Sequence, residues 1–478
     1  MKKQIDSRYE GGRIVPLKLK RFSGEKKRGM AKENNRAFYS AVLRIAIPVI
    51  LQNLITIGVN MVDTLMLGQY GETQLSGSSL ANEFITIFQI LCMGMGGGAA
   101  VLTAQYWGAK DLPSLRKAIA IMLRFCLVIA GAFTVAVLCF PSQIMGLYTP
   151  DPLIVEMGTR YFRYSAFTFI LSGVSLTLMI ILKSIRQMKA PLFISIAAFS
   201  VNVFCNWVFI FGHLGMPEMQ IEGAALGTLI ARGVECLLVV WYVFCRDKQI
   251  GFRVRHLFQR CGDLVRVYFR YSLPVICSDG LLALGNSLVA VIGGHIGAAF
   301  VSANAVISQV VRMSTVFNQG ISQASSTLTG NTLGEGDCDR AFRQGKILLR
   351  LSFLAGLVAS GIILLVTPAI ISQYAFSAET MAVAEQLTAA VALMVVFQTL
   401  QGVTTKGILR GGGDTMFLVF ADVFFLWCVS VPLGYLAALV WHLPPFVVYI
   451  ALKSDYILKS MLCIYRFYTR KWMRRVSV

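Results

Sequence analysis

The most constraining feature of this sequence is a series of apolar runs of about 20 residues, which recur from Ala41 to Tyr465 with almost no long polar interval. A helix of about 20 apolar residues spans the ~30 Å hydrocarbon core of a bilayer. Only 14% of the 478 residues are charged, whereas a soluble domain keeps roughly a quarter of its residues charged. The sequence therefore predicts a helical membrane protein and excludes a soluble globular fold.

The apolar runs and the polar residues between them predict twelve membrane-spanning helices. The expected spans lie at about 41–67, 76–104, 118–140, 155–182, 191–211, 223–245, 271–293, 302–328, 347–369, 381–407, 416–440 and 446–466. The expected fold class is therefore all-α integral membrane, with twelve transmembrane helices.

Lys and Arg residues concentrate on one side of these spans: in the N-terminal tail, after each even-numbered span, and at the C-terminus. Cytosolic loops carry such an excess of positive charge. We therefore expect both termini in the cytosol and the chain in the plasma or inner cell membrane. The net charge of +20 then reflects membrane topology and contact with anionic membrane lipids, and no nucleic-acid partner is expected.

The sequence also repeats itself at a shift of 226 residues. Residue types that rarely match by chance align at this shift, in the pairs Pro48 and Pro274, Asn60 and Asn286, Gly68 and Gly294, Gly94 and Gly320, Gly108 and Gly334, and Asp111 and Asp337. Each half has six spans, so both halves enter the membrane in the same direction. The repeat predicts two lobes related by pseudo-twofold symmetry along the membrane normal, with substrate bound between the lobes and transport by rocking of one bundle against the other.

The expected domains follow from this repeat. They are a basic cytosolic N-terminal tail at 1–40, an N-lobe at 41–245, a cytosolic linker at 246–270, a C-lobe at 271–467 and a basic cytosolic C-terminal tail at 468–478.

Three stretches resemble the multidrug and toxic compound extrusion family. The stretch from Pro48 to Gly68 is similar to the first helix of that family, the run GILRGGGDT from Gly407 to Thr415 to the segment after its tenth helix, and Gly223 to Glu235 to span six of one prokaryotic branch. The likeness covers about residues 40–468. It implies secondary antiport, in which amphipathic organic cations leave the cell as Na⁺ or H⁺ enters. No cofactor besides the coupling ion is expected, and we expect a monomer.

Asp63 is the strongest candidate for the coupling residue. An acid within a span costs about 2.5–3.5 kcal/mol on insertion scales, so it normally faces the bundle interior or a water-filled cavity. Gln52, Thr56, Asn60 and Asp63 are spaced by four, four and three residues and share one helix face. The repeat places Val289 at the equivalent position of the C-lobe. The hypothesis is that Asp63 binds the coupling cation or proton and releases it when substrate arrives; the alternative is a static hydrogen-bond network.

Asn202 and Asn206 lie one helical turn apart in span five. The resemblance places both beside Asp63, where their amide oxygens would help to coordinate Na⁺. One branch of the family has an acid where this chain has Asn206, so the coupling ion stays open. Hydrogen bonding between helices, worth ~0.6 kcal/mol, is the alternative. No other metal site is expected, because the four histidines do not cluster.

Pro48 and Pro274 lie inside the first span of each half. Proline removes a backbone hydrogen bond and permits a kink. The resemblance implies that the first helix bends during transport; two purely structural kinks are the alternative.

Asn60 is a further candidate for cation coupling, and Gln52 is a candidate for the substrate cleft. Other polar groups inside spans are also candidates for the cleft. Asp279 is a displaced equivalent of the acid that the sodium-coupled branch carries where this chain has Leu282, a counter-ion for substrate, or a residue near the cytosolic mouth. Asp422 either lines the cleft or belongs to a static ion pair. Glu83 and Arg312 either line the cleft or pair with other groups to hold the lobes. Arg232 and Glu235, three residues apart, are expected to form a structural pair on one helix face.

Three other functions are compatible with a polytopic membrane protein. A flippase for a lipid-linked oligosaccharide or another lipid tends to line its cavity with several basic residues, and this chain offers few cations in mid-span beyond Arg312. An enzyme needs a convergent catalytic set, yet the histidines fall in loops or at span ends, so no enzymatic activity is expected. A channel is disfavoured because paired lobes favour alternating access.

Overall fold

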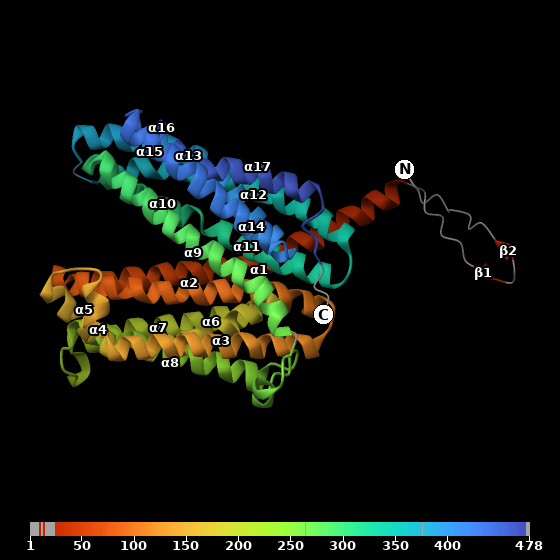
Figure 1. Cartoon of the computed structure of the whole chain (residues 1–478), viewed down its shortest axis with the longest axis horizontal. Helices are drawn as coiled ribbons and strands as arrows, with labels where there is room; N and C mark the ends of the chain where they lie inside the picture. Colours follow the sequence, from red (N-terminus) through yellow and green to blue (C-terminus); the bar gives the residue numbers. More distant parts are fainter. Residues whose placement is uncertain (1–8, 11–12, 15–23, 263, 375, 475–478) are drawn as a thin grey trace.

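The computed structural model describes residues 9–10, 13–14, 24–262, 264–374 and 376–474 (Figure 1). Much of the predicted N-terminal tail and the end of the C-terminal tail therefore lie outside the described residues. Two short antiparallel strands, β1 (Tyr9–Glu10) and β2 (Arg13–Ile14), are the only described strands. The rest of the described structure is helices joined by short loops, because a helix satisfies its backbone polar groups within its own segment in lipid.

The first half of the chain forms the N-lobe. Its helices are α1 (Gly24–Gly68), α2 (Glu72–Gly108), α3 (Leu112–Cys139), α4 (Pro141–Gly146), α5 (Pro152–Ser165), α6 (Thr168–Ser184), α7 (Lys189–Phe211), η1 (His213–Gly215), α8 (Gln220–Trp241) and η2 (Tyr242–Arg246). The short helix η3 (Val254–Phe258) follows in the predicted linker. Helices α5 and α6 meet at a bend of 58° and form one broken span.

The second half forms the C-lobe. Its helices are α9 (Leu264–Ile296), α10 (Ala298–Ser314), α11 (Val316–Gly334), α12 (Cys338–Ile371), α13 (Ala378–Gly402), η4 (Val403–Leu409), α14 (Thr415–Val423), η5 (Phe424–Ser430), α15 (Val431–Tyr435), η6 (Leu436–Val440), α16 (Pro445–Leu452) and α17 (Ser454–Tyr468). Helices α10 and α11 bend by 44° and again form one span. Helix α9 begins at Leu264, several residues before the expected end of the linker.

The twelve predicted spans are confirmed in the described residues. Nine helices are long and apolar enough to cross a membrane, and the two bent pairs raise the number to eleven. The twelfth span is α16 followed by α17, which break at Lys453 and carry Asp455 and Lys459 in the same stretch. These charges lower its hydropathy.

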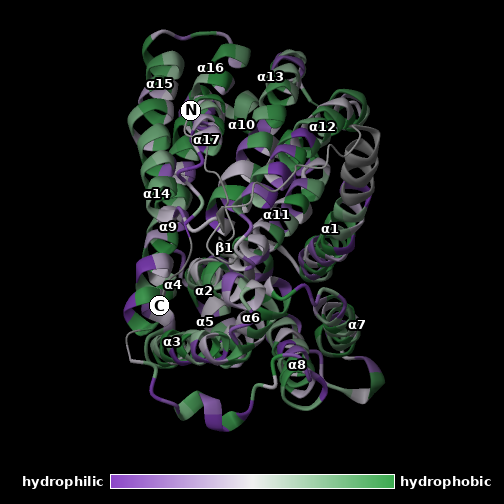
Figure 2. Cartoon of the chain, turned by 90° about the vertical axis from the view of Figure 1, so that its right-hand side faces the viewer, coloured by the Kyte–Doolittle hydropathy of each residue, from purple (hydrophilic) through white to green (hydrophobic). Residues whose placement is uncertain are grey.

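Hydrophobic residues predominate along the helices (Figure 2), and many of their large side chains are exposed, as a lipid environment requires. Large apolar side chains such as Leu365, Leu237 and Val128 are exposed by 79%, 70% and 68%. In water such a surface would cause association, whereas in a bilayer it contacts lipid tails.

The two lobes lie closest at the end near the C-terminus and diverge towards α5 and α16 (Figure 1). Residues related by the 226-residue shift make equivalent contacts at the junction. A Cβ atom on Gly108 would collide with the backbone oxygen of Asn331, and one on Gly334 would collide with that of Gln105. Gly94 against Ile276 and Gly320 against Ile50 form a second such pair. The sequence repeat is therefore a pseudo-twofold relation between the lobes.

The candidate bending positions lie inside continuous helices. Helix α1 continues through Pro48 and α9 through Pro274. Bending of α1 during transport remains a prediction.

Candidate functional site

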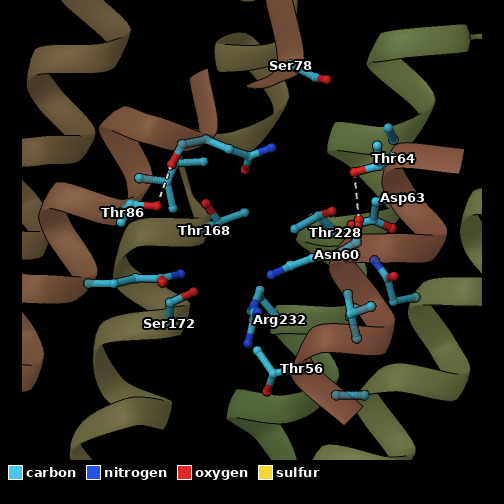
Figure 3. Close-up of a pocket in the computed structure, with 18 of the residues that line it drawn as sticks. Thr56, Asn60, Asp63, Thr64, Ser78, Thr86, Thr168, Ser172, Thr228 and Arg232 are labelled. Carbon is cyan, nitrogen blue, oxygen red and sulfur yellow. Dashed lines mark hydrogen bonds between the residues drawn. The ribbon is translucent and has the colours of Figure 1, made fainter. Parts of the chain in front are cut away.

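A cavity of about 370 Å³ lies within the N-lobe, bounded by α1, α2, α5, α6, α7 and α8 (Figure 3). Two thirds of its lining residues are polar or charged. Among them are Thr56, Asn60, Asp63, Thr64, Ser78, Thr86, Thr168, Ser172, Thr228 and Arg232, which Figure 3 labels. Every residue that lines this cavity belongs to the N-lobe. The cavity therefore lies inside one lobe, whereas the sequence repeat predicts a substrate site between the two lobes.

Asp63 and two asparagines of α7 form a hydrogen-bonded group at this cavity. Asn206 Nδ2 donates to Asp63 Oδ1 at 2.5 Å and lies 3.5 Å from Asn202 Oδ1. Both asparagines are almost fully buried. The structure thus brings together Asp63, Asn60 and Asn202 on the cavity wall, with Asn206 behind them.

The position of Asn206 depends on a glycine of the neighbouring helix. A Cβ atom on Gly227 of α8 would lie 2.3 Å from Asn206 Oδ1. The absence of a side chain at Gly227 therefore lets α7 and α8 pack closely while Asn206 turns towards Asp63. Only the packed structure reveals this requirement.

Arg232 and Glu235 of α8 also line the cavity. Arg232 Nη1 donates to Glu235 Oε2 at 2.6 Å, which confirms the predicted ion pair. The sequence predicted only a structural role for this pair and did not place it at a cavity. In the structure the Arg232 side chain is 32% exposed and points into the cavity (Figure 3). Spacing along one helix predicts such a pair but not the space beside it.

The other N-lobe candidates divide between the cavity wall and its support. Glu83 of α2 lines the cavity. Gln52 does not, but its Nε2 donates to Ser195 Oγ at 2.8 Å, and Ser195 is a lining residue. Gln52 therefore holds α1 against α7.

Arg312 lies away from the N-lobe cavity, and its place in a cleft between the lobes remains a prediction. It lies near the end of α10 in the C-lobe, is exposed, and does not line the N-lobe cavity. The sequence pattern does not distinguish the outer face of α10 from its inner face, because both are largely apolar.

Asp422 belongs to a buried group of charges in the C-lobe. Lys459 Nζ lies 3.1 Å from Asp422 Oδ1 and 3.4 Å from Asp455 Oδ2, and Ser278 Oγ donates to Asp422 Oδ2 at 2.6 Å. All three charged side chains are at most 4% exposed. This geometry favours the ion pair that was the alternative interpretation of Asp422, with Lys459 and Asp455 as partners that the sequence did not single out.

Asp279 is also paired and lies away from the N-lobe cavity. Arg410 Nη2 is 3.0 Å from Asp279 Oδ1. Arg410 itself lies beside Gly97 of α2, where the lobes meet. The geometry favours a residue of the lobe junction over a cleft counter-ion.

No group of three or more His, Cys, Asp or Glu side chains that could hold a metal ion occurs among the residues that the structure describes. Asp63 with Asn202 and Asn206 has fewer acids than such a group requires, so Na⁺ binding there remains a prediction.

Comparison with known proteins gives one family for both halves of the chain. The MatE family model matches residues 48–208 and 274–436, which together exceed half of the sequence. A probable multidrug resistance protein NorM from Agrobacterium fabrum is 23% identical, over 84% of this chain and 87% of the relative. A protein of the same name from Thermotoga maritima is 23% identical, over 93% and 96%.

Solved structures share the fold. An outward-facing multidrug resistance MATE family transporter of the MOP superfamily superposes with a TM-score of 0.81 at 18% identity, covering 90% of this chain and 96% of that chain.

Proposed function

Because the chain belongs to the multidrug and toxic compound extrusion (MatE) family, we propose that it is a secondary active antiporter that exports small organic molecules in exchange for Na⁺ or H⁺. It is a multi-pass membrane transporter and not an enzyme. The NorM relatives are probable multidrug resistance proteins, which supports amphipathic organic cations as substrates. In the proposal the transporter acts as a monomer in the cell membrane, with both termini in the cytosol.

The observation that carries the proposal is Asp63 in a polar cavity, where its one hydrogen-bond donor among the described residues is the Asn206 amide. An acid inside a span is costly unless a charge compensates it. A proton or Na⁺ supplies that charge when the cavity holds no substrate. A cationic substrate supplies it instead when it binds, so that substrate and coupling ion occupy the site in turn.

The two-lobe architecture supports alternating access by a rocking motion. The lobes meet through close backbone contacts at one end, as at Gly108 and Gly334, and diverge towards the other (Figure 1). With the termini in the cytosol, the described conformation faces outward. Transport then requires these contacts to separate while contacts form at the opposite end.

A lipid flippase is a weaker candidate. A cavity that holds a diphosphate would need several basic residues, whereas Arg232 is the only Lys or Arg that lines this cavity, beside Asp63, Glu83 and Glu235.

Ethidium efflux from proteoliposomes tests the proposal. Na⁺ and proton gradients are imposed separately on wild-type protein and on Asp63→Asn. We expect one gradient to drive efflux in the wild type and neither to drive it in Asp63→Asn. Gradient-driven efflux by Asp63→Asn at wild-type rates would remove Asp63 from the coupling step.

Asp151→Asn is a matched control. Asp151 is exposed and caps α5 by accepting a hydrogen bond from the Leu153 amide. Asn caps helices about as well as Asp, so this variant should transport like the wild type. If neither gradient drives ethidium efflux by the wild type, the proposed export of organic cations is wrong.

A further inference from the structure

The lining of the N-lobe cavity is rich in hydroxyl and amide groups. Ser and Thr side chains occur on α1, α2, α6, α7 and α8, and Tyr161 and Phe199 are the only aromatic residues of the lining. Pockets that bind drug-sized apolar molecules are lined mainly by hydrophobic and aromatic side chains. This cavity therefore offers many hydrogen bonds and little apolar surface.

Charges of both signs face this space from different helices. Asp63 lies on α1 and Glu83 on α2, while Arg232 comes from α8. Arg232 already has Glu235 as its counter-ion, whereas Asp63 and Glu83 form no ion pair with a described Lys or Arg. An ammonium group on a ligand can therefore pair with these acids, and a carboxylate on the same ligand can accept from the remaining N–H donors of Arg232. The complementary ligand carries both charges.

Arg232 has unused hydrogen-bonding capacity. A guanidinium has five N–H donors, and the hydrogen bond to Glu235 is the only one that Arg232 makes to a described residue. The remaining donors of this partly exposed side chain point towards the cavity (Figure 3). A guanidinium that presents adjacent N–H groups matches the geometry of a carboxylate.

We propose that the N-lobe cavity binds small hydrophilic zwitterions, with the ligand carboxylate on Arg232 and its ammonium group on the Asp63 and Glu83 side. Arg232 is then the residue that selects for a carboxylate. This inference rests on the proposed transport function and narrows its substrate class: an apolar cation such as ethidium has no group for Arg232.

Thermal stabilisation of the purified full-length protein in detergent tests the inference. The probes are glutamine, serine and the dipeptide glutaminylserine, each compared with its C-terminal amide, a cation, and its N-acetyl form, an anion. We expect the zwitterions to raise the unfolding midpoint at concentrations at least tenfold lower than the matched amides or N-acetyl forms.

The double variant Arg232→Gln/Glu235→Gln removes the carboxylate-binding group without leaving Glu235 unpaired. It should lose the tenfold preference for zwitterion over amide, and Arg232→Lys should keep part of it. Arg160→Gln/Glu156→Gln removes an exposed pair of the same type, whose N–O distance is also 2.6 Å, and should keep the full preference.

Two results would overturn the inference: amides that stabilise the wild type as well as the zwitterions do, or a double variant at 232 and 235 with an unchanged preference. Wild-type protein that exports ethidium but is stabilised by no zwitterion would also overturn it, while the proposed function would stand. Zwitterion binding that depends on Arg232, without gradient-driven ethidium efflux, would support the inference. The same result would contradict only the proposed export of apolar cations.

Discussion

In the N-lobe, the acid of the first helix, Asp63, borders a polar cavity; in the C-lobe, the equivalent position holds Val289, packed in an apolar cluster. The C-lobe has its own buried acids, Asp422 and Asp455, but Lys459 lies between them. One repeat therefore supports two uses of buried charge. Acids that a lysine neutralises hold helices together, whereas an acid that faces a cavity with only an amide partner is free to bind a ligand.

The largest expected effect comes from the C-lobe charges. Lys459→Met leaves two buried carboxylates without a cation, and removal of one partner from a buried ion pair costs about 3–5 kcal/mol. We expect a loss of that size in the free energy of unfolding, measured in mixed micelles.

Lys453→Met is the control for this prediction, because Lys453 forms no ion pair with a described residue: it donates an exposed hydrogen bond to Asn286 and lies over the Tyr456 ring. Equal stability of the Lys459→Met and Lys453→Met variants would show that the buried charges do not hold the C-lobe together.

A smaller loss of stability is expected when an acid is placed in the C-lobe at the position equivalent to Asp63. Val289→Asp places an acid at the position equivalent to Asp63, but Val289 is only 9% exposed and packs among apolar residues. We expect a destabilisation of up to about 2.5–3.5 kcal/mol, which is the cost of an acid at the centre of a span on insertion scales. Val289→Asn, measured by the same unfolding experiment, separates the charge from the change in shape. A fully stable Val289→Asp protein would mean that the C-lobe tolerates an acid without a cavity.

The smallest losses of stability are expected at the junction between the lobes, where equivalent substitutions in the two lobes should have equal effects. Gly108→Val and Gly334→Val each force a side chain against the backbone of the other lobe, and overpacking costs about 1–3 kcal/mol. Both variants should lose similar stability and slow ethidium efflux. Gly131→Val is the control, because a Cβ there meets nothing within 4 Å. A large difference between Gly108→Val and Gly334→Val would argue against the functional equivalence of the two halves.

The fold was largely predictable from the sequence because lipid imposes strong rules on it. Long apolar runs identify most spans, and matching Pro and Gly positions identify the repeat. Apolar runs also identified the span at 446–466, although Asp455 and Lys459 reduce its apolar content.

The site was predictable only in part. The cost of an acid in a span singles out Asp63, and helical spacing pairs Arg232 with Glu235. The contact of Lys459 with Asp422 joins different helices, and the polar cavity beside Arg232 depends on how six helices pack. Neither leaves a local pattern in the sequence, so the two alternatives for Arg312 and Asp422, a cleft position or a paired group, stayed open there.

The most direct test of the central claim is the release of the coupling ion when substrate binds. Ethidium is added to purified protein in weakly buffered solution with a pH indicator, and in parallel to protein loaded with radioactive Na⁺; ethidium fluorescence polarisation verifies binding in each sample. We predict that the wild type and Asp151→Asn release protons or Na⁺ on binding and that Asp63→Asn releases neither. Release from Asp63→Asn equal to that of the wild type would contradict the account.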